Sequence, residues 1–251
     1  MNYPGHSVKQ QAFDIASVKA IQHQLNKKGC GPININGDFD HNTHYAVMLF
    51  QTRFTDCFGN PLKIDGIVGP VTWSALFGDQ NVKAITRTPN TLLAAVLDVA
   101  RSQVGIKEFP SGGKDGPPVT KYHNAAGIQH GQCWAMAFVY WCFNQACIHL
   151  EVANPLYKTG DVFETMVKSK CKIITPEDAK IDAGRVLPGH IFIISTGGGH
   201  SHTGLIEKVE NEMLTTIEGN ISHQNTRDAI GVFRRTGRMI NTINTGFIEF
   251  E

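Results

Sequence analysis

The stretch WAMAFVYWC (residues 134–142) decides the fold of the second half of the chain. It is heavily apolar, and we expect a helix from Ala135 to about Ala146. After Pro188-Gly189 the pattern changes to short β-branched or aromatic runs between Gly, Asn and His turns, at residues 191–194, 204–209, 214–217, 231–233 and 246–250. Helices first and strands afterwards predict an α+β domain with an antiparallel sheet.

The residues before this domain predict a small helical domain that extends to about Gly78. Apolar residues at 18, 21 and 25 lie on one helical face, and two similar loop–helix units follow, with turns at Asn36-Gly37 and Asp65-Gly66. Residues 79–91 are polar and predict a linker. We therefore expect a three-helix domain in residues 1–88 and an α+β domain in residues 89–251.

A helix is expected next, from Thr91 or Leu92 until Gly105. Beyond it, Gly112-Gly113 and Gly116-Pro117-Pro118 predict a long loop before the apolar helix.

Composition excludes several functional classes. Lys and Arg number 23 and Asp and Glu 22, so the net charge of +1 gives no broad basic surface for nucleic acid. No stretch approaches the roughly 18 apolar residues of a membrane span. The first twenty residues lack an apolar core, so we expect no Sec signal peptide. The six cysteines form no CxxC pair, which argues against a zinc knuckle or a disulfide scaffold.

A catalytic pattern lies in the strand-rich region. His202-Thr203-Gly204 places a histidine at the start of one strand, and Glu218-Gly219-Asn220 places a carboxylate and an amide at the end of the next. Adjacent antiparallel strands bring such residues together. A histidine oriented by a carboxylate or an amide is the base of a nucleophilic triad, and the missing member would be a cysteine at a helix N-terminus.

Two family resemblances cover most of the chain. The two turn–helix units, with Phe50-Gln51 between them, resemble the three-helix peptidoglycan-binding domain of bacterial and phage wall enzymes over residues 15–78. Residues 92–251 resemble the CHAP domain, a papain-like cysteine peptidase and amidase domain. The motifs that carry this second resemblance are Val104-Gly105-Ile106-Lys107-Glu108, residues 134–142, Pro188-Gly189, His202-Thr203-Gly204 and Glu218-Gly219-Asn220.

One departure from the CHAP pattern affects the nucleophile. The family's usual string is Trp-Cys-Ala-Ala-Phe-Val-x-Trp, and here an alanine, Ala135, stands at the cysteine position. Cys133 is the alternative nucleophile. Spacing favours Ala135, because the expected core residues Phe138 and Val139 follow it by three and four positions. The resemblance therefore implies an inactive chain, most simply an engineered replacement of the cysteine, with a natural pseudoenzyme as the alternative.

The resemblance also implies a function. CHAP enzymes cleave amide bonds of peptidoglycan, between muramic acid and L-alanine or within the peptides, and here His202 would be the base, with Glu218 or Asn220 orienting it. We expect a phage endolysin or a secreted antibacterial effector, made in the cytoplasm and acting in the periplasm or wall after lysis or specialised secretion. Peptidoglycan is the expected partner, an effector would add an immunity protein, and we expect a monomer without a cofactor. The rival is a non-catalytic wall-binding protein.

The remaining histidines and acidic residues predict no metal site. His200 and His202 lie on one face of a strand but have no third ligand. Some CHAP domains carry a calcium loop, but here residues 111–118 offer only Asp115. We expect a structural role for His190.

A basic cluster, Arg234, Arg235 and Arg238, lies on a predicted strand near the C-terminus. We expect it to be a solvated face of an edge strand.

Overall fold

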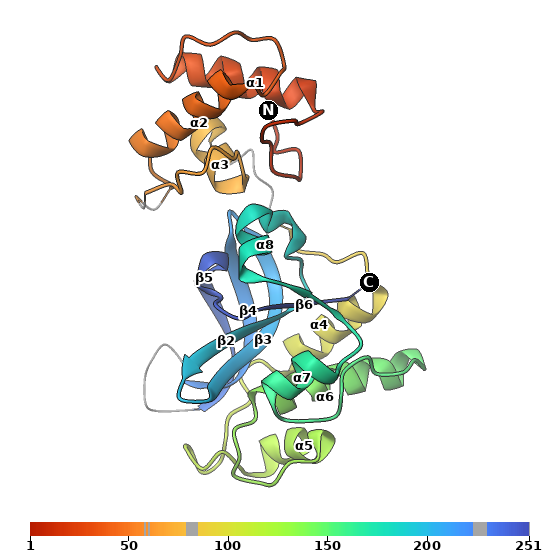
Figure 1. Cartoon of the computed structure of the whole chain (residues 1–251). Coiled ribbons are helices and arrows are strands. Elements are labelled where there is room, and N and C mark those ends of the chain that lie inside the picture. The colour runs from red at the N-terminus through yellow and green to blue at the C-terminus, as the bar shows by residue number, and fades with distance from the viewer. Residues whose placement is uncertain (58, 60, 79–84, 223–229, 251) are drawn as a thin grey trace. The chain divides into compact units, whose positions relative to one another are not determined.

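A computed structural model describes residues 1–57, 59, 61–78, 85–222 and 230–250 of the chain, which form two compact units (Figure 1). One unit comprises Met1–Ala84 with Ile181–Gly184 and Glu210–Glu212; the other comprises Ile85–Lys180, Arg185–Val209 and Met213–Glu251. Each unit has its own buried apolar core.

The first unit contains three helices, as expected: α1 (Ile15–Lys27), α2 (His41–Arg53) and α3 (Pro70–Phe77). Aspartates open the first two, since Asp14 accepts a hydrogen bond from the Ser17 N–H and Asp40 accepts one from the Thr43 N–H. Helix α3 begins with a proline, whose fixed φ suits the first helical position. Apolar side chains from all three helices form the core of this unit.

A buried glutamine holds the turn between α1 and α2. The Gln22 amide donates hydrogen bonds to Asn36 Oδ1 (2.9 Å), the Asp38 carbonyl (2.8 Å) and Thr43 Oγ1 (3.0 Å). Its own oxygen accepts from the Gly37 N–H at 2.9 Å. Gly37 has a φ of 84°, a conformation that glycine adopts without strain. One side chain thus satisfies the polar groups of the whole turn.

Gln51 performs the same task in the second turn–helix unit of this domain. Its amide donates to Asp65 Oδ1, the Ile67 carbonyl and Thr72 Oγ1, and its oxygen accepts from the Gly66 N–H. Each glutamine is separated from its four partners by 14, 15, 16 and 21 residues, and these separations are identical in the two turn–helix units. The similarity of the two turn–helix units in the sequence is therefore a structural repeat.

The second unit is an α+β domain with one six-stranded antiparallel sheet, as predicted. Its helices are α4 (Thr91–Gln103), α5 (Pro117–Ala126), α6 (Ala135–Leu150), α7 (Val162–Lys168) and α8 (Pro176–Ile181). Its strands are β1 (Lys172–Ile174), β2 (Ile191–Gly197), β3 (His200–Glu210), β4 (Met213–Ser222), β5 (Ile230–Met239) and β6 (Gly246–Glu249), in the order β1-β6-β2-β3-β4-β5.

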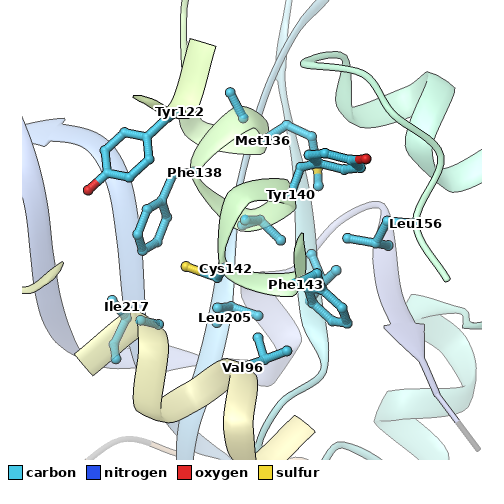
Figure 2. Packing of buried hydrophobic residues seen from close by; sticks show 14 of the residues in the cluster. Val96, Tyr122, Met136, Phe138, Tyr140, Cys142, Phe143, Leu156, Leu205 and Ile217 are labelled. Atoms are coloured by element: carbon cyan, nitrogen blue, oxygen red, sulfur yellow. The ribbon is translucent and has the colours of Figure 1, made fainter. Parts of the chain in front are cut away.

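Helix α6 is the centre of this domain's core. Helices α4 and α5 pack against it, and it contacts β4 of the sheet. Figure 2 shows side chains of α4, α5, α6 and the sheet gathered around it, including Val96, Tyr122, Phe138, Leu205 and Ile217. Each such side chain contributes about 1.5–3 kcal/mol when fully buried. The apolar stretch therefore folds as a helix that is covered on nearly all sides.

Two sequence expectations need correction. Pro117-Pro118 lies in α5 rather than in a loop, because Gly116, with a φ of 106°, turns the chain and Pro117 begins the helix. Within the predicted linker, Ile85 forms an antiparallel bridge with Val209 of β3, and residues 79–84 lie outside the described residues. Short elements such as β1, α7 and α8 were not predicted.

The glutamine of the first unit gives a test of this architecture. Gln22→Ala leaves the Gly37 N–H without its partner in a buried turn, so we expect the free energy of unfolding of this domain to fall by about 1–3 kcal/mol. Urea denaturation measures it. Gln24→Ala, at a half-buried position of the same helix, is the control and should change little. An equal decrease in the free energy of unfolding in both variants would contradict the role assigned to Gln22.

Candidate active site

The histidine and the carboxylate that the sequence singled out lie against each other. His202 on β3 and Glu218 on the neighbouring strand β4 form a hydrogen bond of 2.7 Å between Nε2 and Oε2. Gly204, two residues after the histidine, makes the approach feasible, because a Cβ there would lie 2.8 Å from Glu218 Cγ. The His-x-Gly motif therefore has a steric cause.

Glu218 is fully buried and remains ionised. Burial alone would raise the pKa of this carboxyl, but the hydrogen bond and charge of His202, the charge of Arg238 and a hydrogen bond from Thr216 outweigh it and lower the pKa to about 2. An ionised carboxylate only accepts hydrogen bonds, so His202 must carry its proton on Nε2. In the neutral ring, Nδ1 is then the nitrogen that can accept a proton.

Ala135 is the first residue of α6. The N–H groups of a helix's first turn have no partner within the helix, and the helix dipole stabilises negative charge there. Gly219, next to Glu218, packs against this end, since a Cβ on it would lie 2.8 Å from both Trp134 and Phe138 side chains. Strand β4 thus passes the first turn of α6 at Gly219, the residue that follows Glu218.

The other two predicted residues lie close in sequence to these positions. Cys133 is exposed, precedes α6 and accepts a hydrogen bond from Lys114 Nζ at 3.3 Å. Asn220 has a φ of 60° and lies where the pairing of β4 with β5 shifts register, between Glu218 and Ile221. The bulge interrupts strand alternation there, so Glu218 and Asn220 are not held as a simple same-face pair.

A second buried carboxylate anchors the start of α6. Glu108 accepts a hydrogen bond of 2.7 Å from Trp134 Nε1, and its other oxygen accepts from the N–H groups of Gly112 and Lys114. These bonds fix the residue that immediately precedes Ala135. The sequence placed Glu108 in a family motif but did not reveal this task.

Sequence reasoning also missed the cation beside Glu218. The expectation of a solvated basic face is wrong for Arg238, which is 14% exposed and bonds the buried carboxylate, and Arg234 pairs with Glu207. A fully buried glutamate requires a compensating cation, so a buried position for Glu218 implies a basic side chain beside it.

The remaining expectations concern histidines and metals. His190 is buried, which lowers its pKa to about 4, and its Nδ1 accepts from the Leu187 N–H; these features fit a structural role. His200 is exposed. Within the described residues, no group of three His, Cys, Asp or Glu side chains could hold a metal ion, and no helix is long and apolar enough to cross a membrane.

The first unit has a surface pocket of about 360 Å³ between α2 and the loop that follows α1. Tyr45 lines it and is 65% exposed, beside the amides of Asn34 and Asn42. An exposed aromatic ring next to amide groups offers both apolar contact and hydrogen bonds to a ligand.

Comparison with known families assigns both units. Residues 15–76 match the family model described as a putative peptidoglycan binding domain, and residues 122–220 match that of the CHAP domain. The chain carries a peptidoglycan-binding domain followed by a CHAP domain. The CHAP match contains Ala135, His202 and Glu218. Searches of curated proteins and of solved structures find no significant match. The two domains support a role in hydrolysing or binding the cell wall.

The lowered pKa of Glu218 predicts a pH-dependent stability. The carboxyl's pKa falls from 4.5 in the unfolded chain to about 2 in the folded protein, so the ionised group adds about 3 kcal/mol to the free energy of unfolding. This stabilisation is fully present above about pH 4.5 and is lost as the pH falls through about 2. Wild type should therefore be more stable than Glu218→Gln at pH 7, and the difference should narrow towards pH 3. Urea denaturation at several pH values measures this.

Glu151→Gln, which changes an exposed glutamate at the end of α6, is the control and should show little pH-dependent difference. A stability difference for Glu218→Gln that stays constant from pH 7 to pH 3 would contradict the ionised, buried state of Glu218.

Proposed function

We propose that this chain has the architecture of a peptidoglycan hydrolase whose nucleophile is replaced. Residues 1–88 hold the wall, and residues 89–251 form the domain that cleaves an amide bond of peptidoglycan. The observation that carries the proposal is the His202–Glu218 pair on neighbouring strands, of which β4 packs against α6, the helix that begins at Ala135. An alanine cannot attack a carbonyl, so the chain with Ala135 is inactive.

With a cysteine at position 135, the chemistry follows from this arrangement. His202 Nδ1 takes the thiol proton while Glu218 holds the Nε2–H, which gives a thiolate–imidazolium pair. The thiolate attacks the amide carbonyl, and free N–H groups at the start of α6 stabilise the oxyanion. The imidazolium returns its proton to the leaving amine, and water, with His202 as base, then releases the acyl group and restores the thiol.

The biological setting is either a phage endolysin or an antibacterial effector delivered to the periplasm or wall. An effector would require an immunity protein that blocks the site. The second candidate function is a wall-binding protein without turnover, and the observation that favours it is Ala135 itself. Both candidates place the chain on peptidoglycan.

Restoring the nucleophile separates the two candidates. We expect Ala135→Cys to clear a suspension of purified sacculi, whereas the parent chain does not. Ala137→Cys, which adds a thiol two residues further along the same helix, should remain inactive, because this position is fully buried and lies about 200° around the helix from residue 135. If Ala135→Cys binds sacculi but does not cleave them, the chain is a wall-binding protein.

Single substitutions in the Ala135→Cys background identify the orienting residue. We expect Glu218→Ala to lower kcat by about 100-fold or more with little change in binding, because the imidazole loses the group that holds its tautomer. Asn220→Ala should have a smaller effect. Steady-state kinetics on solubilised peptidoglycan measures both. Abolition of activity by Asn220→Ala alone would reverse the assignment and indicate a Cys-His-Asn site.

The pocket beside Tyr45 predicts where the first domain contacts the wall. We expect Tyr45→Ala in the full chain to weaken retention on sacculi about tenfold, because stacking on an aromatic ring contributes of the order of 1 kcal/mol. Sedimentation with sacculi measures retention. Tyr157→Ala removes an exposed tyrosine of the other domain and is the control. Equal retention of both variants would place the wall contact elsewhere.

A further inference from the structure

We infer that Arg238 is a positioning residue that holds the Glu218 carboxylate in the orientation in which it accepts the His202 proton. The guanidinium donates to both carboxylate oxygens, from Nη2 to Oε1 at 2.9 Å and to Oε2 at 3.1 Å, and from Nε to Oε1 at 3.2 Å. Such a planar fork fixes the plane of a carboxylate, which a single donor does not. The inference extends the proposed function, because it assigns a task at the same site.

The five hydrogen bonds of Glu218 fix the orientation of its two oxygens. Oε1 accepts from Thr216 at 2.6 Å and from Arg238, whereas Oε2 accepts from His202 Nε2 at 2.7 Å and from Arg238 Nη2 at 3.1 Å. Without Arg238, the carboxylate keeps only the hydroxyl and the imidazole as partners. Rotation about its side chain then becomes less costly, and the imidazole is no longer held in one plane.

Phe192 supports the arginine and the histidine together. The Arg238 guanidinium lies 4.7 Å from the centre of the Phe192 ring, and the same ring meets His202 edge-on with centroids 6.0 Å apart. Phe192 is fully buried on β2, so it is a rigid support. Strands β3 and β5 thus each supply one partner of the β4 carboxylate, and β2 supplies the ring that contacts both partners.

Arg234 provides a matched control on the same strand. It forms a two-point ion pair with Glu207, as Arg238 does with Glu218, but Glu207 pairs with two arginines, Arg101 and Arg234, and not with the histidine. Loss of Arg234 removes an arginine–carboxylate pair from the same strand, although a more exposed one. An effect seen with Arg238 variants and not with Arg234→Gln therefore belongs to the His202–Glu218 pair.

The first experiment needs no catalysis. Long-range ¹H–¹⁵N spectra of the full chain report which ring nitrogen of His202 carries the proton. We expect the Nε2–H tautomer in the parent chain and in Arg234→Gln, and a mixture with the Nδ1–H tautomer in Arg238→Gln. Arg238→Lys, which keeps the charge but not the fork, should show an intermediate mixture, and it decides the question if Arg238→Gln does not fold.

The second experiment measures kinetics in the Ala135→Cys background. We expect Arg238→Gln to lower kcat about 10- to 100-fold with KM nearly unchanged, and Arg238→Lys to recover part of the loss. Arg238 variants that match Arg234→Gln in both tautomer and kcat would overturn the inference. If the tautomer changes but Ala135→Cys is inactive in every background, the positioning role stands and the proposed hydrolase function fails.

Discussion

The carboxylate of Glu218 is enclosed by the sheet, and the site depends on how its charge is compensated. An unpaired charge at such a position would cost several kcal/mol, so its neighbours must supply hydrogen bonds and opposite charge. His202 of β3, Arg238 of β5 and Thr216 of its own strand do so, and the Phe192 ring of β2 contacts both His202 and Arg238. The same contacts that make the buried charge tolerable also fix the tautomer of the imidazole, so stability and catalytic geometry have a common origin.

Two glycines allow this arrangement to meet the helix. Gly204 leaves room for the Glu218 side chain, and Gly219 lets β4 lie against Trp134 and Phe138 at the start of α6. The helix end is also held by the hydrogen bond between Trp134 and Glu108. The position of residue 135 is therefore determined by packing and hydrogen bonds that do not involve its own side chain, which explains why an alanine there is compatible with the fold.

The sequence predicted the parts of the structure that follow a local period. Short β-branched and aromatic runs between turn residues predicted the longer strands, the apolar stretch predicted α6, and the spacing of His202 and Glu218 on consecutive strands anticipated their contact. Arg238 was not predictable in this way, because its position depends on two register shifts between β4 and β5 that no periodicity reveals. Gln22 and Gln51 were missed because a buried glutamine has no distinct pattern, although the repeat that they support was visible. Helix α5 was missed because its two prolines suggested a loop.

The central proposal is that a cysteine at position 135 would lie beside His202 and lose its proton to this base. The most direct test is the rate at which the thiol in Ala135→Cys is alkylated, in a chain that also carries Cys133→Ser to remove the neighbouring thiol. Peptide mass spectrometry measures this rate at about pH 5.5, where an ordinary thiol is almost fully protonated. The account predicts a rate at least about tenfold above that of the exposed Cys57 in the same molecule, and loss of this advantage in His202→Ala. A thiol at position 135 that reacts no faster than Cys57, or equally fast without His202, would contradict it.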